Sequence, residues 1–202
     1  MAVLYQNDNP GIVASIASLK ENLKGTNIKI VAEESYNSGE RDFRSLILKT
    51  KNSGADIYFI EAVAPELEIL AKQIKEAGIK TPLTSIESFE FTDQPKLFEG
   101  LWYVNAADQS QAFMDKFKTA YGETPKFGGG NGYDTINILV YAYEKAGDGK
   151  TIPTSNQVVS ALLSIQNFDG AMGTLNMGQD HIVNTKAVVR MIKNGVPTTI
   201  AE

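Results

Sequence analysis

SYNSGERDFRSLILKTKNSGADIYF, residues 35–59, is the stretch that decides the fold of this chain. It joins an extended run, an acidic turn, an amphipathic segment with Phe43, Leu46, Ile47 and Thr50 on one helical face, a glycine stop at Gly54 and an apolar strand. Two parallel strands need a crossover of a dozen or more residues, which is usually a helix. We therefore predict a parallel strand-helix-strand unit here.

Short apolar runs recur along the first half of the chain, at spacings that leave room for one helix between each pair. The predicted strands are Ala2–Gln6, Asn27–Ala32, Asp56–Ile60, Pro82–Ser85 and Leu101–Asn105. Strands that alternate with helices are typical of a parallel α/β layer. The predicted fold class is therefore α/β, with a flavodoxin-like parallel sheet and flanking helices.

The pattern changes beyond Asn105, where helical segments predominate. The predicted helices are Gln109–Tyr121, Tyr133–Lys145 and Asn156–Ile165. β segments follow at Ala171–Asn176 and Thr185–Lys193, with Asn194-Gly195 as a tight turn. We therefore divide the chain into an α/β core at residues 1–105, a mainly helical segment at 106–168 and a C-terminal β element at 169–202.

The composition excludes several classes of function. The chain has 202 residues and a net charge of -5, so we expect no nucleic-acid partner, because binding to phosphates needs a basic surface. There is no cysteine, which excludes disulfides, thiolate metal sites and cysteine nucleophiles. The sequence contains no apolar run of roughly 20 residues that would span a membrane and no recognisable signal peptide.

Motifs for nucleophilic catalysis and phosphate binding are not recognised. The only histidine, His181, lies in a polar turn, and no Gly-X-Ser-X-Gly sequence is present. The glycine-rich run Phe127–Gly132 lacks the Lys-Ser/Thr ending of a phosphate-binding loop. We interpret this run as a turn before a helix, with Tyr133 and Asp134 orienting the start of the helix.

Two pairs of neighbouring carboxylates are candidates for acid/base chemistry. Glu33 and Glu34 are adjacent at the end of a predicted strand and would point to opposite faces. Glu87 and Glu90 are close in sequence, but a catalytic pair also needs burial that separates the two pKa values. We therefore predict no catalytic residues, no metal site and no cofactor.

Four short segments carry a resemblance to a known family. They are Leu4–Gly11, Gly39–Phe43, Gly132–Asp134 and Phe168–Gly173. In this order and spacing they resemble the type I extracytoplasmic solute-binding proteins of branched-chain amino acid ABC transporters. The resemblance implies two α/β lobes that close over a ligand, with residues 1–105 as the core of the second lobe. It also implies that Gln109–Ile165 returns to the first lobe, whose amino-terminal half lies outside this chain.

The resemblance also implies a ligand site. One acidic ligand contact of the family falls on Glu87, whose carboxylate would accept hydrogen bonds from a ligand ammonium. Two contacts that are commonly aromatic fall on Pro10 and Val63, with Asn9 and Ala64 beside them. Neither Pro10 nor Val63 stacks as a tyrosine does, which puts the usual amino-acid specificity in doubt. All five lie where ligands bind in doubly wound sheets, at the carboxyl ends of the strands.

The resemblance implies a function in binding rather than catalysis. The expected ligand is an amino acid or a related polar solute such as an amide, and in a full-length protein the closed form would be presented to an ABC permease. The implied location is periplasmic or extracellular. Two alternatives stay open: a ligand-sensing domain of a receptor or amide-type regulator, and an enzyme of flavodoxin-like topology.

The helices after Asn105 carry apolar faces that need a partner. One predicted helix contains Tyr141 and Tyr143 together with Ile136, Leu139 and Val140. If the sheet that such helices cover is incomplete, these faces are exposed, and exposed apolar patches usually mark interaction sites. We therefore expect a homo-oligomer, or refolding of these helices onto another surface.

Overall fold

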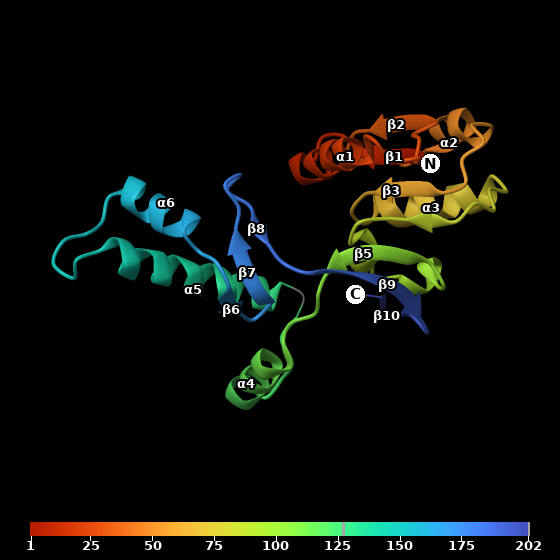
Figure 1. The fold of residues 1–202 in the computed structure, drawn as a ribbon. Helices are drawn as coiled ribbons and strands as arrows, with labels where there is room; N and C mark the ends of the chain where they lie inside the picture. Colours follow the sequence, from red (N-terminus) through yellow and green to blue (C-terminus); the bar gives the residue numbers. More distant parts are fainter. Residues whose placement is uncertain (127, 202) are drawn as a thin grey trace. The chain divides into compact units, whose positions relative to one another are not determined.

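The structure, a computed structural model, describes residues 1–126 and 128–201. These residues form two compact units. The first unit comprises Met1–Asn105 and the residues from Val188 onward, and the second comprises Ala106–Ala187 (Figure 1). The segment 169–202, predicted to be one β element, is therefore divided between the two units, with its last two strands in the first.

The first unit is built on a four-stranded parallel sheet of order β2-β1-β3-β4. Its strands are β1 (Ala2–Gln6), β2 (Ala32–Tyr36), β3 (Tyr58–Glu61) and β4 (Leu83–Thr84). The crossover helices are α1 (Pro10–Leu23), α2 (Arg44–Lys51) and α3 (Glu66–Glu76) (Figure 1). The predicted parallel α/β layer is confirmed.

Helices cover both faces of this sheet because successive strand residues point in opposite directions. Val3 and Phe59 pack against Ile12 and Ile16 of α1 on one face. Leu4 and its neighbours pack against α2 and α3 on the other face, in a larger cluster. Full burial of such a side chain stabilises the fold by roughly 1.5–3 kcal/mol. The four strands therefore end in turns at one common edge of a rigid layer.

The predicted strand Asn27–Ala32 is wrong, because the strand runs instead from Ala32 to Tyr36. Its register pairs Ala32 with Ala2 and Tyr36 with Gln6 of β1. β2 is an edge strand, and its polar residues find partners on the flanking helices. Glu33 contacts Lys20 of α1 at 2.5 Å, and Glu34 contacts Lys49 of α2 at 2.8 Å. The two carboxylates thus point to opposite faces, as predicted.

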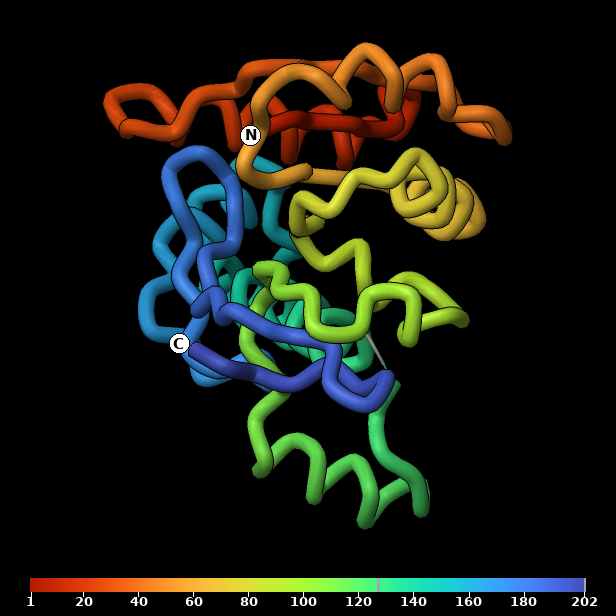
Figure 2. The backbone as a smooth tube through the Cα atoms, turned by 90° about the vertical axis from the view of Figure 1, so that its right-hand side faces the viewer, coloured from red at the N-terminus to blue at the C-terminus, as the bar shows by residue number. Residues whose placement is uncertain are grey.

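A second sheet of order β10-β9-β5 completes the first unit. It consists of β5 (Trp102–Ala106), β9 (Ala187–Lys193) and β10 (Val196–Ala201), and Figure 2 shows the last two beside the much earlier β5. A parallel bridge between Ile86 and Val104 links β5 to the segment after β4. Asn194 and Gly195 both have positive φ, 54° and 74°, which confirms the predicted tight turn between β9 and β10.

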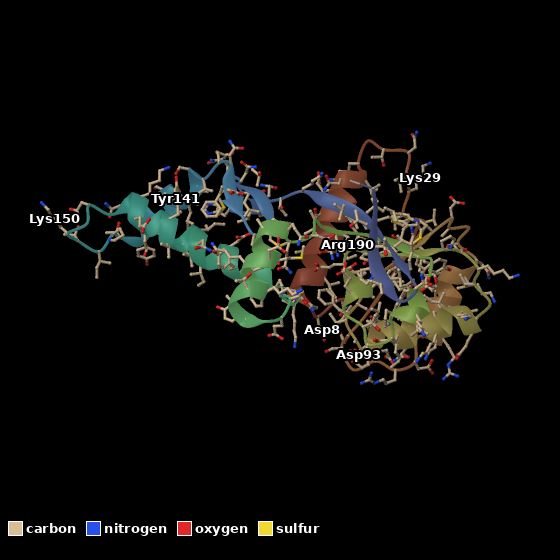
Figure 3. The ribbon with its side chains drawn as sticks, turned by 90° about the horizontal axis from the view of Figure 1, so that it is seen from below. Asp8, Lys29, Asp93, Tyr141, Lys150 and Arg190 are labelled. Carbon is tan, nitrogen blue, oxygen red and sulfur yellow. The ribbon has the colours of Figure 1, made fainter. Side chains whose placement is uncertain are left out.

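A buried ion pair joins the second sheet to the segment that follows β4. Arg190 of β9, labelled in Figure 3, donates from Nη1 to Glu90 Oε1 at 2.7 Å. The same oxygen accepts from Tyr103 Oη at 2.9 Å and from Asn105 Nδ2 at 2.7 Å. The side chains of Arg190 and Glu90 are only 9% and 10% exposed. Glu90, in the 3-10 helix η1 (Ser88–Glu90), therefore connects η1 with β5 and with β9, which lies 100 residues further along the chain.

The second unit combines helices with a small antiparallel sheet of order β6-β7-β8. Its elements are α4 (Gln111–Tyr121), α5 (Gly129–Ala146), α6 (Ser155–Leu163), β6 (Phe168–Gly170), β7 (Gly173–Met177) and β8 (Val183–Asn184). The glycines before Tyr133 belong largely to the first turn of α5. A Cβ at Gly130 would lie 2.8 Å from Met172 Sδ, so close packing explains a glycine there. Phe127 lies outside the described residues.

Asp134 ties α5 to the small sheet rather than orienting the start of the helix. It is 3% exposed, and its two oxygens accept from the N–H groups of Ala171 at 2.6 Å and Met172 at 2.8 Å. A Cβ at Gly170 would lie 2.6 Å from Asp134 Oδ2, which requires a glycine at that position. Two of the four segments that suggested a family are thus in direct contact.

We expect Asp134→Asn to destabilise the second unit by about 2 kcal/mol, because one buried N–H would face an amide NH2 group and lose its acceptor. Thermal unfolding followed by circular dichroism measures this loss. Asp169→Asn, at an exposed position of β6, is the matched control and should change stability by less than about 0.5 kcal/mol. Equal melting of the two variants would contradict the role given to Asp134.

Large apolar side chains are exposed on α5. They are Tyr133, Ile136, Leu139, Val140, Tyr141 and Tyr143. Tyr141, labelled in Figure 3, packs edge-on against Phe168 with ring centroids 5.9 Å apart and is still 39% exposed. Self-association through this face stays a prediction. In the part of the chain that the structure describes, none of the helices has the length and apolar character that crossing a membrane requires.

Candidate functional site

A cavity of about 290 Å³ lies within the first unit, at the carboxyl ends of β1, β3 and β4. Its lining residues come from α1 and its preceding turn, from the end of β3 and from the turn after β4. They are Asn9, Gly11, Ile12, Ser15, Glu61, Ala62, Val63, Glu87, Ser88 and Phe91. This is the edge of a doubly wound sheet at which small ligands bind.

Three of the five predicted site residues, Asn9, Val63 and Glu87, line this cavity. Pro10 and Ala64 do not line it and are exposed. Pro10 is the first residue of α1, a position where its missing N–H group is not needed and its ring faces solvent. Ala64 directly follows Val63 in the chain and is exposed. The structure thus separates these two residues from the other three.

Glu87 projects into the cavity from a specialised turn between β4 and η1. Its φ of 48° is uncommon for a residue other than glycine. The backbone is held on both sides: its N–H donates to Val104 O at 2.8 Å, and its carbonyl accepts from Glu90 N at 2.8 Å. Burial and the nearby Glu90 raise the pKa of the Glu87 carboxyl above its usual range. Left-handed backbone in a residue of this kind often accompanies a functional position.

Glu61, the last residue of β3, is a second carboxylate in the same cavity. It is 4% exposed, and its Oε2 accepts from Ser85 Oγ at 2.9 Å and from Ile86 N at 3.0 Å. Burial raises the pKa of Glu61 from 4.5 to about 7, although these hydrogen bonds act in the opposite direction. Glu61 was not among the predicted site residues. Its position at the end of an apolar strand, two residues before the predicted Val63, is the sequence signal that could have identified it.

Asn9 has a structural role that limits what it offers to a ligand. Its Oδ1 accepts from Gly11 N at 3.0 Å and from Ile12 N at 3.3 Å, so it is the N-cap of α1. The first amides of the helix are therefore already satisfied and do not present themselves to an anion. The Nδ2 group of Asn9 remains as a hydrogen-bond donor at the cavity.

The electrostatic character of the cavity is acidic. It is lined by two carboxylates, three small polar side chains and an apolar wall, and no lysine, arginine or histidine lies among the lining residues. Glu90 does not form an acid/base pair with Glu87, because Glu90 is held by Arg190. Within residues 1–126 and 128–201, no group of three acidic or histidine side chains is placed to hold a metal ion. The arrangement therefore favours a small cationic group.

Comparison with known proteins identifies the family. The sequence profile of the family called Periplasmic binding protein matches residues 1–196. The chain belongs to the periplasmic binding protein family. Members of this family are periplasmic or extracellular solute-binding proteins. The predicted resemblance to the type I proteins of branched-chain amino acid transporters is confirmed.

Curated relatives of this periplasmic binding protein chain bind amino acids. It is 23% identical over 198 residues to the leucine-, isoleucine-, valine-, threonine- and alanine-binding protein of Pseudomonas aeruginosa, covering 89% of the chain and 49% of that protein. It is 25% identical over 192 residues to Leu/Ile/Val-binding protein homolog 8 of Brucella abortus, covering 84% and 45%. The chain thus spans about half the length of these relatives.

Solved structures of similar proteins show the same fold. The leucine-binding protein LivK of Thermotoga maritima matches with a TM-score of 0.76 and 21% identity, over 99% of this chain and 59% of that one. LivJ of Streptococcus pneumoniae, solved with isoleucine, matches with a TM-score of 0.70 and 22% identity, over 100% and 60%. The periplasmic-binding-protein fold predicted from the sequence is thereby confirmed.

Proposed function

We propose that the first unit of this periplasmic binding protein chain binds a small solute with an ammonium group, an amino acid or a related amine. The cavity at the ends of β1, β3 and β4 is the site, and Glu87 accepts hydrogen bonds from the ammonium group. The relatives named as amino-acid-binding proteins support this proposal. In this proposal the chain acts in binding and not in catalysis.

The carboxylate of Glu87 in an acidic cavity is the observation that carries the proposal. A charge-assisted hydrogen bond is roughly twice as strong as a neutral one, and it gains further strength in a cavity that excludes water. Ile12, Val63 and Phe91 supply an apolar wall for the aliphatic part of the solute. Ligand sites commonly combine such a wall with a few polar groups that fix the orientation of the ligand.

An anionic solute is less compatible with this cavity. A structurally similar solute-binding protein of R. palustris was solved with benzoate, at 16% identity and a TM-score of 0.75. Benzoate, unlike an amino acid, has no ammonium group to offset the repulsion between its carboxylate and those of Glu61 and Glu87, and no basic side chain lines the cavity. We therefore expect this unit to bind amines more tightly than aromatic acids.

The role in the cell is part of the same proposal. A solute-binding protein in the periplasm or outside the cell delivers its ligand to an ABC permease when its lobes have closed. A sensory role, in which the same ligand-binding unit belongs to a receptor or regulator, stays a prediction. The two roles share the binding site and differ in the partner that recognises the closed form.

Glu87→Gln should weaken the binding of an amino acid by about 10- to 100-fold, because it removes the charge from the principal acceptor. Isothermal titration calorimetry with leucine, isoleucine, valine and lysine measures the dissociation constants. Glu76→Gln is the matched control, since Glu76 is exposed near the end of α3 and lies outside the cavity. The same affinity in the Glu87→Gln variant and the unmodified chain would refute the assigned role.

A further inference from the structure

The cavity contains one more carboxylate than the binding of a single ammonium group requires. Glu87 and Glu61 approach it from different strands, Glu87 from the turn after β4 and Glu61 from the end of β3. Their proximity shows in the electrostatics, because the charge of Glu87 helps to raise the pKa of Glu61. Two like charges that share one small cavity destabilise each other until one carboxylate takes up a proton or a cation lies between them.

The donors around Glu61 are neutral. Ser85 Oγ and Ile86 N both donate to Oε2, and Ser88 also forms a hydrogen bond with this carboxyl group. Hydrogen bonds of this kind hold the carboxyl group in position but do not neutralise it. A carboxylate that is 4% exposed and lacks a cationic side chain among the lining residues is energetically unfavourable unless it is protonated or meets a cationic ligand.

The size and the lining of the cavity limit the size and shape of the cationic ligand that could bind to Glu61. At about 290 Å³ the cavity is at the lower end of the range for small-molecule sites. The apolar side chains of Ile12, Val63 and Phe91 lie in the same cavity as the two carboxylates. This combination suits a short methylene chain that carries a cationic group at each end.

We propose that this cavity selects solutes with two cationic groups joined by a short aliphatic chain, such as basic amino acids or diamines, with one group on Glu87 and the other on Glu61. The inference rests on the proposed function, since it takes the same cavity to be the ligand site. It narrows that function from amino acids in general to ligands with a second positive charge. Glu61 is then the residue that determines specificity.

Selectivity in this site depends on pH. The titratable groups around Glu61 are Glu87 after β4 and the phenol of Tyr36 at the end of β2, whereas α1 contributes the non-titrating Asn9 and Ser15. Only the ionised form of Glu61 binds the second cation. Because its pKa is about 7, the affinity for a dicationic ligand should fall by up to about tenfold per pH unit below neutrality. The affinity for a monocationic ligand should change much less.

The test compares lysine with norleucine, which has the same carbon chain but no terminal amine, by calorimetry on the complete 202-residue chain. At pH 8 we expect lysine or the diamine cadaverine to bind at least about tenfold more tightly than norleucine, and at pH 5.5 we expect this preference to disappear. Cadaverine lacks a carboxylate, so it distinguishes diamines from basic amino acids. Preference for either one supports the proposal.

Glu61→Gln should abolish the preference for lysine and leave the weaker binding of norleucine unchanged. Glu68→Gln is the matched control, because Glu68 is also 4% exposed in the same unit but does not line the cavity. If the Glu61→Gln variant does not fold, nuclear magnetic resonance titration of the unmodified chain still tests the proposal. Lysine at saturation should lower the pKa of Glu61 by at least about one unit.

Two results would overturn the inference. One is that norleucine binds as tightly as lysine at pH 8 and Glu61→Gln has no effect on either affinity. This result would show that Glu61 does not bind a second cationic group, and it would leave the proposed function standing. No binding of lysine, cadaverine, norleucine or leucine at millimolar concentration would overturn both the inference and the proposed function.

Discussion

Glu90→Ala is expected to lower the free energy of unfolding of the first unit by about 3–5 kcal/mol. The substitution removes the carboxylate that Arg190 contacts at 2.7 Å in a setting where both side chains are about nine-tenths buried. It also takes the acceptor away from the Tyr103 hydroxyl and the Asn105 amide. Removing one member of a buried ion pair is strongly destabilising, and each buried donor that loses an acceptor adds to the loss.

Urea denaturation followed by the fluorescence of Trp102, the only tryptophan, measures this loss in β5 itself. Glu76→Ala, at an exposed site on α3, is the control and should change stability by less than about 0.5 kcal/mol. The double variant Glu90→Leu with Arg190→Met should be more stable than Glu90→Ala, because apolar side chains of similar volume replace both members of the buried pair. A loss below about 1 kcal/mol in Glu90→Ala would show that solvent reaches the ion pair.

Glu61→Gln is expected to stabilise the first unit above pH 7 and to leave its stability unchanged near pH 4. Burial raises the pKa of Glu61 from 4.5 to about 7, so the folded state holds a proton that the unfolded state has lost between these two values. The contribution of Glu61 to stability is therefore fully present below pH 4.5 and lost as the pH rises through 7. The loss amounts to about 3 kcal/mol, and glutamine, which does not ionise, avoids it.

Urea denaturation at several pH values between 4 and 9 tests this expectation through the difference in stability between the variant and the unmodified chain. The difference should grow over the interval from about pH 4.5 to pH 7 and then become constant. A difference for Glu61→Gln that does not vary with pH would mean that Glu61 ionises normally in the folded protein.

Much of the fold followed from hydrophobic periodicity. The strands around Val3 and Phe59 were predicted within two residues, because both faces of a central parallel strand are buried and its sequence is continuously apolar. β2 was misplaced because it is an edge strand whose residues Glu33 and Glu34 form ion pairs with helices. Its polar sequence gave no strand signal, whereas the apolar run before it did.

The candidate site was predictable in position but not in composition. The order of strands and helices implied that the turns after β1, β3 and β4 meet at one edge. Which side chains enter the cavity depends on local geometry that no spacing reveals, such as the left-handed backbone of Glu87 and the outward ring of Pro10. Glu61 was missed because its importance comes from burial next to another carboxylate, a property of the folded chain.

The return of β9 and β10 to β5 has a consequence for the order of events during synthesis. The bond between Glu90 and Arg190 joins positions 100 residues apart. A ribosome releases the whole second unit before it releases the strands that finish the first. Until β9 has been synthesised, the edge of β5 that pairs with it is uncovered. Contacts over such long sequence separations are also slow to form. A partly folded state with an unpaired strand edge of this kind is prone to aggregation.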